Sequence, residues 1–312
     1  MKISDVVGCV GWAVFVLIGS ALLPFLGPFL SLLTPLPFLY YSTKLGPYQG
    51  LKLAASATLI IAVFAKLSGH PEVVIFCIEF SLLGVCLSAL FKKGFGPAQT
   101  ILFATGFVLS VALGFFLFLA VIKGIRPNEM LMNYLQTQLT ASIQAYEEMG
   151  ISQESAMDFQ AYGKVFVDAI LKVYPSLMVV GTGLVVWLNV VLAKPLFKKG
   201  NLKYPAFSPV DRWQAPDILV WGLIVSGFAL FLTSGGIKLL AVNTVIILFL
   251  VYLFQGLSIV LFFFNKYKLP AWLRMGIYFL IIIQQLFLAV VALAGLFDQW
   301  VDFRKIHRHS ES

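Results

Sequence analysis

The sequence is short of charged residues. Asp, Glu, Lys and Arg make up only 12% of the 312 residues, against roughly 25% in an ordinary soluble domain. Hydrophobic residues make up 60%, and the mean hydropathy is +0.93. A chain of this composition cannot cover a surface that faces water. We therefore expect an all-α, polytopic membrane helix bundle.

Residues that commonly bind metals or catalyse reactions are scarce too. The chain has three cysteines in apolar runs and three histidines, and none of them has carboxylates or thiols at the spacing of metal ligands. It contains no P-loop, no dinucleotide-binding glycine fingerprint and no G-x-S-x-G nucleophile elbow. We expect no enzyme activity, no cofactor and no metal. Any source of energy would lie on another chain.

Long apolar runs predict about nine membrane spans, each of which needs about 20 mostly apolar residues. The expected spans are residues 6–23, 24–43, 51–67, 73–91, 100–122, 175–192, 218–234, 237–264 and 276–297. Four prolines interrupt the second run, and such a break is tolerated where neighbouring helices cover the freed backbone groups. If this broken run does not cross, the count falls to eight.

A polar insert at residues 123–174 divides the chain into three parts. Residues 1–122 and 175–312 are expected to form the N-terminal and C-terminal membrane bundles, the latter with a polar tail. Within the insert, Leu131, Leu135 and Leu139 share one face at helical spacing. We expect the insert to be an extracytoplasmic helical hairpin.

The net charge of +8 comes from basic residues scattered between apolar runs, so the expected partner is the lipid bilayer and not nucleic acid. Lys and Arg collect in cytoplasmic loops. The basic pair Lys92–Lys93 and the basic loop 194–212 therefore place the N-terminus inside and the acidic insert outside. The result is a multi-pass protein of the bacterial inner membrane. Nine spans leave the basic tail outside, against the same rule.

Polar residues inside the apolar runs are the candidate binding residues. Glu79 is the most informative, because an ionisable group in hydrocarbon suggests a functional contact. The alternative is that Glu79 is protonated or reaches the outer interface. Amides can bind a polar ligand or another helix, and they occur at Asn189, Asn243, Gln255, Gln284 and Gln285. Gln255 and Ser258 share a helix face, and Glu79 with this face is expected to line a polar pocket.

The end of the last run suggests a structural motif. Asp298 and Asp302 are four residues apart, so they share a helix face, and Arg304 or Lys305 can compensate their charge. We expect these residues to close the last helix.

Several short stretches resemble the YybS-like family of bacterial membrane proteins. They are Leu-Thr-Pro-Leu-Pro at 33–37, Gly-Pro-Tyr-Gln-Gly at 46–50, Trp-Gln-Ala-Pro-Asp at 213–217, Gln-Gly-Leu-Ser at 255–258 and the closing segment 295–305. The resemblance implies a membrane protein and carries no reaction with it. The proline-bearing segment and the Gly46–Gly50 turn are also distantly similar to the substrate-binding subunits of energy-coupling-factor transporters and to MreD.

Two functions fit this sequence. One is a small-molecule-binding or transport subunit that works with membrane or ATPase partner subunits. The other is a non-transporting envelope or scaffold protein. They differ in one structural expectation: a binding subunit needs Glu79, Gln255, Gln284 and Gln285 to converge on one cavity, whereas a scaffold leaves them dispersed among helix contacts.

Overall fold

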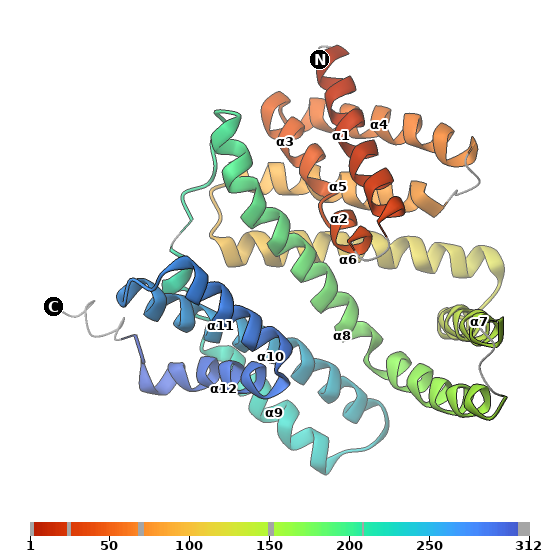
Figure 1. Ribbon diagram of the computed structural model, residues 1–312, viewed down its shortest axis with the longest axis vertical. Coiled ribbons are helices and arrows are strands. Elements are labelled where there is room, and N and C mark those ends of the chain that lie inside the picture. The colour runs from red at the N-terminus through yellow and green to blue at the C-terminus, as the bar shows by residue number, and fades with distance from the viewer. Residues whose placement is uncertain (1–2, 24–25, 68–71, 149–152, 208, 305–312) are drawn as a thin grey trace. The chain divides into compact units, whose positions relative to one another are not determined.

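The structure is a computed structural model that describes residues 3–23, 26–67, 72–148, 153–207 and 209–304 (Figure 1). These residues form helices and connecting loops, with no strand among them. The helices are α1 (Ile3–Leu22), α2 (Gly27–Ser31), α3 (Pro35–Leu45), α4 (Pro47–Leu67), α5 (Glu72–Lys92), α6 (Pro97–Lys123), α7 (Pro127–Glu148), α8 (Gln153–Lys199), the short 3-10 helix η1 (Val210–Arg212), α9 (Ile218–Leu232), α10 (Gly235–Lys266), α11 (Ala271–Ile283) and α12 (Gln285–Val301).

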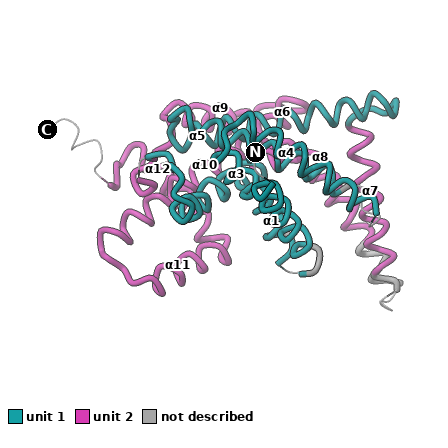
Figure 2. Tube along the Cα trace, turned by 90° about the horizontal axis from the view of Figure 1, so that it is seen from above, with its two compact units in different colours: residues 1–127, 181–206 teal, residues 128–180, 207–312 magenta. Residues whose placement is uncertain are grey.

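The chain divides into two compact units, which Figure 2 colours separately. Unit 1 comprises residues 1–127 and 181–206, and unit 2 comprises residues 128–180 and 207–312. The long helix α8 therefore contributes its first part to unit 2 and its last part to unit 1. Each unit is described by itself below.

In unit 1, the run broken by prolines folds back along the first helix. Lys44, at the end of α3, forms an ion pair of 2.7 Å with Asp5, at the start of α1. The segment from α2 to α3 therefore returns to the end of the unit where α1 began. The expected second span is thus two short helices in place of one long helix.

Neighbouring side chains cover the break between α2 and α3. Pro35 has no N–H to donate to the Ser31 carbonyl, and the hydroxyl of Thr34 donates to that carbonyl instead, at 2.7 Å. The amide of Asn189, on α8, donates to the Leu32 carbonyl at 2.8 Å. Buried backbone groups need such partners, so Asn189 has a structural role.

The polar insert is helical in its described residues. It consists of α7 and the first part of α8, which continues without interruption into the expected sixth span. Pro175 lies inside α8, where a proline weakens the hydrogen-bond ladder. Beside it, Asn243 accepts from the Ser176 N–H and donates to the Lys172 carbonyl, each at 2.8 Å. The carboxamide thus bridges the two backbone groups of one helix turn.

In unit 2, α10 is the central helix, and α9 and α12 pack against it. Ala215, Val220, Leu248 and Tyr252 form a buried apolar cluster, and Leu296 of α12 packs on it. The expected seventh and eighth spans correspond to α9 and α10.

The expected ninth span at 276–297 differs from a single crossing helix. It is the pair α11 and α12, bent by 102°. Arg274, in the first turn of α11, donates to Asn265, and Asn265 donates to the Asp211 carboxylate. Arg304, just after α12, donates to the carbonyl of the same Asp211. A crossing helix keeps its ends about 30 Å apart, so this pair begins and ends on one side of the unit.

By length and composition, the described residues contain six helices that can cross a membrane, or up to seven if the bent pair counts as one span. The proline-broken segment and the 15-residue α9 are shorter apolar pieces outside that count. The chain is an α-helical membrane bundle, as the sequence predicts, and the number of about nine spans is approximate.

Candidate functional site

The most deeply buried charges in the described residues lie at the end of α12. Arg304 Nη2 and Asp298 Oδ2 are 2.6 Å apart, and both side chains are 0% exposed. Two charges removed from water are strongly destabilising unless they are paired and hydrogen-bonded. The pair therefore has to be held by further contacts, and these contacts connect α12 to two other segments of unit 2.

The backbone after α12 aims Arg304 back at the helix. Asp302 adopts the left-handed conformation (φ 45°), and its N–H closes the last turn on the Asp298 carbonyl at 3.0 Å. A left-handed residue at this position ends a helix and turns the chain sharply. The next N–H, that of Phe303, donates to Asp298 Oδ1 at 3.1 Å. Arg304 can then reach Asp298 from beyond the helix.

Arg304 also donates hydrogen bonds to the loop before α9. Its Nη1 lies 2.9 Å from the Asp211 carbonyl and 3.0 Å from the Trp213 carbonyl. The same nitrogen is 2.9 Å from the hydroxyl of Ser258, on α10. That hydroxyl donates to the Val210 carbonyl at 2.6 Å. Only Nε of the guanidinium is left without a hydrogen bond in the described part of the chain.

Gln255 completes the set from α10. Its Nε2 donates to Asp298 Oδ2 at 3.2 Å, and its Oε1 accepts from the Ala215 N–H at 3.2 Å. We call Gln255, Ser258, Asp298 and Arg304 the polar cluster. All four side chains are buried, and each has protein partners.

Two glycines let α10 and α12 approach closely enough to build the cluster. A Cβ added at Gly256 would collide with the Val291 carbonyl, and one at Gly295 would collide with the Tyr252 carbonyl. Small residues at such crossings are a common device of membrane helices. The backbones are therefore in direct contact one turn before Asp298.

Two of the other expected site residues, Gln284 and Gln285, do not join this cluster. Glu79 belongs to unit 1, where it is half-buried on α5, and no described residue forms an ion pair or hydrogen bond with its carboxyl group. Gln284 and Gln285 lie at the bend between α11 and α12, and both are exposed. Within unit 2, the structure brings together only Gln255 and Ser258 of the expected set.

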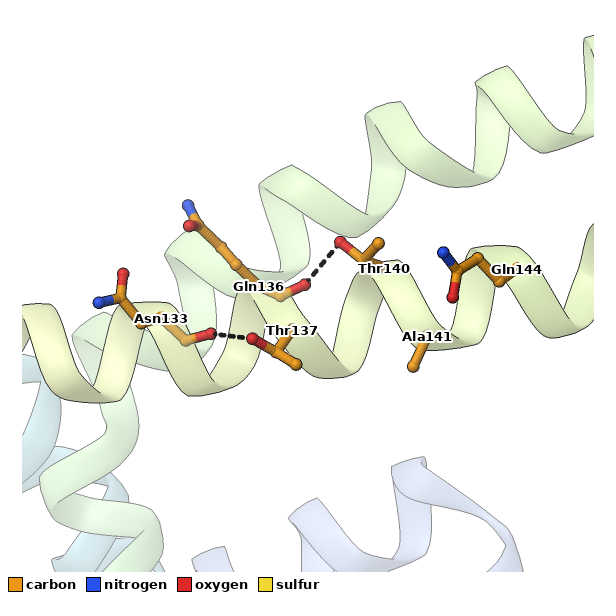
Figure 3. A pocket seen from close by; sticks show the side chains of 6 residues that line it. All are labelled: Asn133, Gln136, Thr137, Thr140, Ala141 and Gln144. Atoms are coloured by element: carbon orange, nitrogen blue, oxygen red, sulfur yellow. Dashed lines mark hydrogen bonds between the residues drawn. The ribbon is translucent and has the colours of Figure 1, made fainter.

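An open depression follows one face of α7 (Figure 3). It has a volume of about 430 Å³ and is lined by Asn133, Gln136, Thr137, Thr140, Ala141 and Gln144. The two threonine hydroxyls bond back to carbonyls of their own helix, as the dashed lines show. This face is polar and uncharged, and we call it the α7 polar face. Because one helix lines it, it does not enclose a small molecule.

Comparison with known proteins agrees with a membrane protein. A family model described as "Predicted membrane protein (DUF2232)" matches residues 12–299. The chain belongs to this family. It is also 22% identical over 287 residues to "Uncharacterized protein YybS" of Bacillus subtilis (strain 168), covering 90% of each chain. The YybS-like resemblance is thereby confirmed. No solved structure matches the chain.

The polar cluster explains why three of the sequence stretches belong together. Trp213–Asp217, Gln255–Ser258 and the closing segment from Gly295 are far apart in the sequence, yet they meet in this one network. The expected closing motif is confirmed for Asp298 and Arg304. The sequence alone did not show that Arg304 reaches the loop before α9. The one signal was the basic residue directly after an apolar helix that ends in aspartates.

Proposed function

We propose that this membrane protein is a scaffold that neither transports a substrate nor catalyses a reaction. The observation that carries the proposal is the closure of the polar cluster. Gln255 and Ser258 are the strongest ligand candidates in the sequence. Their polar groups are hydrogen-bonded to Asp298, Ala215 and Val210 of the protein itself. A binding site needs polar groups that remain available to a ligand.

The two buried asparagines support the same proposal. Asn189 covers the carbonyl freed at the α2–α3 break, and Asn243 bridges the helix turn at Pro175. In both cases an amide that could have bound a substrate stabilises a proline-bearing helix instead. The α7 polar face adds an exposed and uncharged surface on which a partner protein can dock. In the expected topology that surface lies outside the cell.

A small-molecule-binding or transport subunit is the second candidate, and a separate observation favours it. Helices broken within the membrane are where many transporters build their substrate sites. Here α11 and α12 are broken at Gln284, with Gln284 and Gln285 exposed. Glu79 adds an acid with no partner among the described residues. Such a subunit would depend on membrane or ATPase partner subunits for energy.

Mass spectrometry of the purified protein separates the two candidates. The parent and the Glu79→Gln and Gln284→Leu variants are purified in the same detergent, and small molecules released by denaturation are quantified against protein. A scaffold carries lipid alone in all three. A polar molecule present at near one per chain in the parent, and lost in either variant, would establish the transport candidate and reject the scaffold.

A further inference from the structure

Unit 1 gathers lysines at one end. Lys44 lies in the last turn of α3, Lys92 ends α5 and Lys93 follows it, and Lys198 and Lys199 end α8. Lys52 lies in the second turn of α4, directly after the α3–α4 link, and Lys203 follows α8. All seven lysines are exposed. We call them the lysine rim.

Contacts between rings hold these chain ends together. Phe91 packs on Phe197 with ring centroids 5.9 Å apart, and Tyr204 packs on both rings at 5.6 and 6.1 Å. Tyr40, from α3, joins Phe197 at 6.3 Å. Each ring lies within a few residues of a rim lysine. The cluster therefore fixes lysines from α3, α5, α8 and the following loop around one apolar centre.

The rim has almost no compensating negative charge. Unit 1 contains three acidic residues, Asp5, Glu72 and Glu79. Only Asp5 lies at this end, where it pairs with Lys44. Burial raises the pKa of Tyr204 to about 12, so this phenol stays neutral and adds no anion. Six rim lysines are left without an acid from their own unit.

We propose that the lysine rim binds the headgroups of anionic phospholipids. Clustered lysines directly beside membrane helices attract anionic lipid headgroups through charge complementarity. Exposed apolar side chains on the adjoining helices, such as Leu51, Leu102 and Phe103, offer apolar surface to the acyl chains. This inference concerns unit 1 and holds whether or not the scaffold proposal is correct.

The test compares lipid retention between matched pairs of variants. Delipidated protein is incubated with phosphatidylglycerol or with phosphatidylcholine, and bound lipids are counted by native mass spectrometry. The rim variants are Lys92→Gln with Lys93→Gln, and Lys198→Gln with Lys199→Gln. The control variant is Lys66→Gln with Lys123→Gln, which removes two exposed lysines from the last turns of α4 and α6, at the other end of α4 from Lys52.

The parent and the control are expected to prefer phosphatidylglycerol. Each rim pair is expected to lower that preference by between about fivefold and 25-fold, because each lysine near an anionic surface contributes roughly a fivefold change in affinity. Replacing Lys92 and Lys93 by arginine keeps the charge and should keep the preference. In the parent, high salt should abolish it.

Three results would overturn the proposal. The first is equal retention of both lipids by the parent. The second is an equal loss in the rim and control pairs, which would reflect overall charge only. The third is loss of the preference on adding millimolar inorganic phosphate, because the rim would then take a soluble phosphate in place of a lipid. The salt dependence of the parent needs no variant, so the test survives a rim variant that does not fold.

Discussion

Replacing Asp298 by asparagine removes the negative half of the buried ion pair and keeps the shape of the side chain. Arg304 would then remain buried, with two backbone carbonyls, the Ser258 hydroxyl and an amide oxygen as partners. Carbonyl dipoles stabilise a buried cation less well than a carboxylate does. We expect Asp298→Asn to destabilise unit 2 strongly.

The magnitude follows from the burial of both groups. Removing one partner of a buried ion pair lowers the free energy of unfolding by about 3–5 kcal/mol, because the remaining charge is left uncompensated. Both side chains here are 0% exposed, so solvent cannot screen the loss. The pair of Lys44 and Asp5 provides the contrast. It has a similar length, but the lysine side chain is 47% exposed, so the charge that Asp5→Asn leaves behind stays hydrated and that variant should have a smaller effect.

The assay is unfolding in detergent micelles titrated with a denaturing detergent and followed by circular dichroism. The set comprises the parent, Asp298→Asn, Arg304→Met, the double variant and Asp5→Asn. Since the two residues are in contact, the double variant should lose less than the sum of the single variants. A loss below about 1 kcal/mol for Asp298→Asn, or strict additivity, would show that the pair is hydrated and would refute the reasoning.

Three further outcomes are expected. Gly295→Ala should force α10 and α12 apart and lower the free energy of unfolding by about 1–3 kcal/mol, whereas Gly276→Ala, where a Cβ meets nothing within 4 Å, should not; equal effects in the same titration would contradict the close approach. Asn243→Leu should lower that free energy by about 1–3 kcal/mol, because the Ser176 N–H and the Lys172 carbonyl lose their amide partner, against little change for Thr244→Val, whose hydroxyl bonds only to its own helix. If a protein partner docks on the α7 polar face, a photo-crosslinking residue at Gln136 should give an adduct in cells and one at Gln138, on another face of α7, should not; adducts at both positions would show random collision.

The sequence predicts the helical fold well because long hydrophobic runs make up most of the chain. Runs such as 73–91 and 100–122 match α5 and α6 closely, since a long apolar run in lipid must satisfy its backbone internally as a helix. The proline-broken second run forms the two short helices α2 and α3, and its crossing stays a prediction. The sequence could not show which side chain bonds each backbone group that loses its helical partner beside a proline. Asn189 and Asn243 are separated from the positions they cover by many residues, and only the fold brings them together.

The sequence predicted the local features of the candidate site but not the contacts between its helices. Gln255 and Ser258 were correctly placed on one helix face, and Asp298 with Arg304 was correctly expected to close the last helix. Their meeting depends on Gly256 and Gly295, which let two backbones touch, and on the left-handed Asp302. Neither feature has a periodic signal. The participation of Glu79 in a pocket with this face stays a prediction, because Glu79 lies in the other unit.

The bend at Gln284 bears on a conflict between the predicted nine spans and the positive-inside rule. Nine crossings starting from an inside N-terminus place the basic tail outside, although Lys and Arg favour the inside. In the structure, α11 starts beside Asn265 and α12 ends beside Asp211, and those two residues are hydrogen-bonded to each other. Their end of unit 2 also carries Lys266 and Lys268. We expect such a pair to add no crossing, and the eight other expected spans would then bring the end of the chain inside, as the positive-inside rule favours. The polar cluster is what holds this return in place, because Arg304 fixes the end of α12 to the loop before α9 through charges that no solvent reaches.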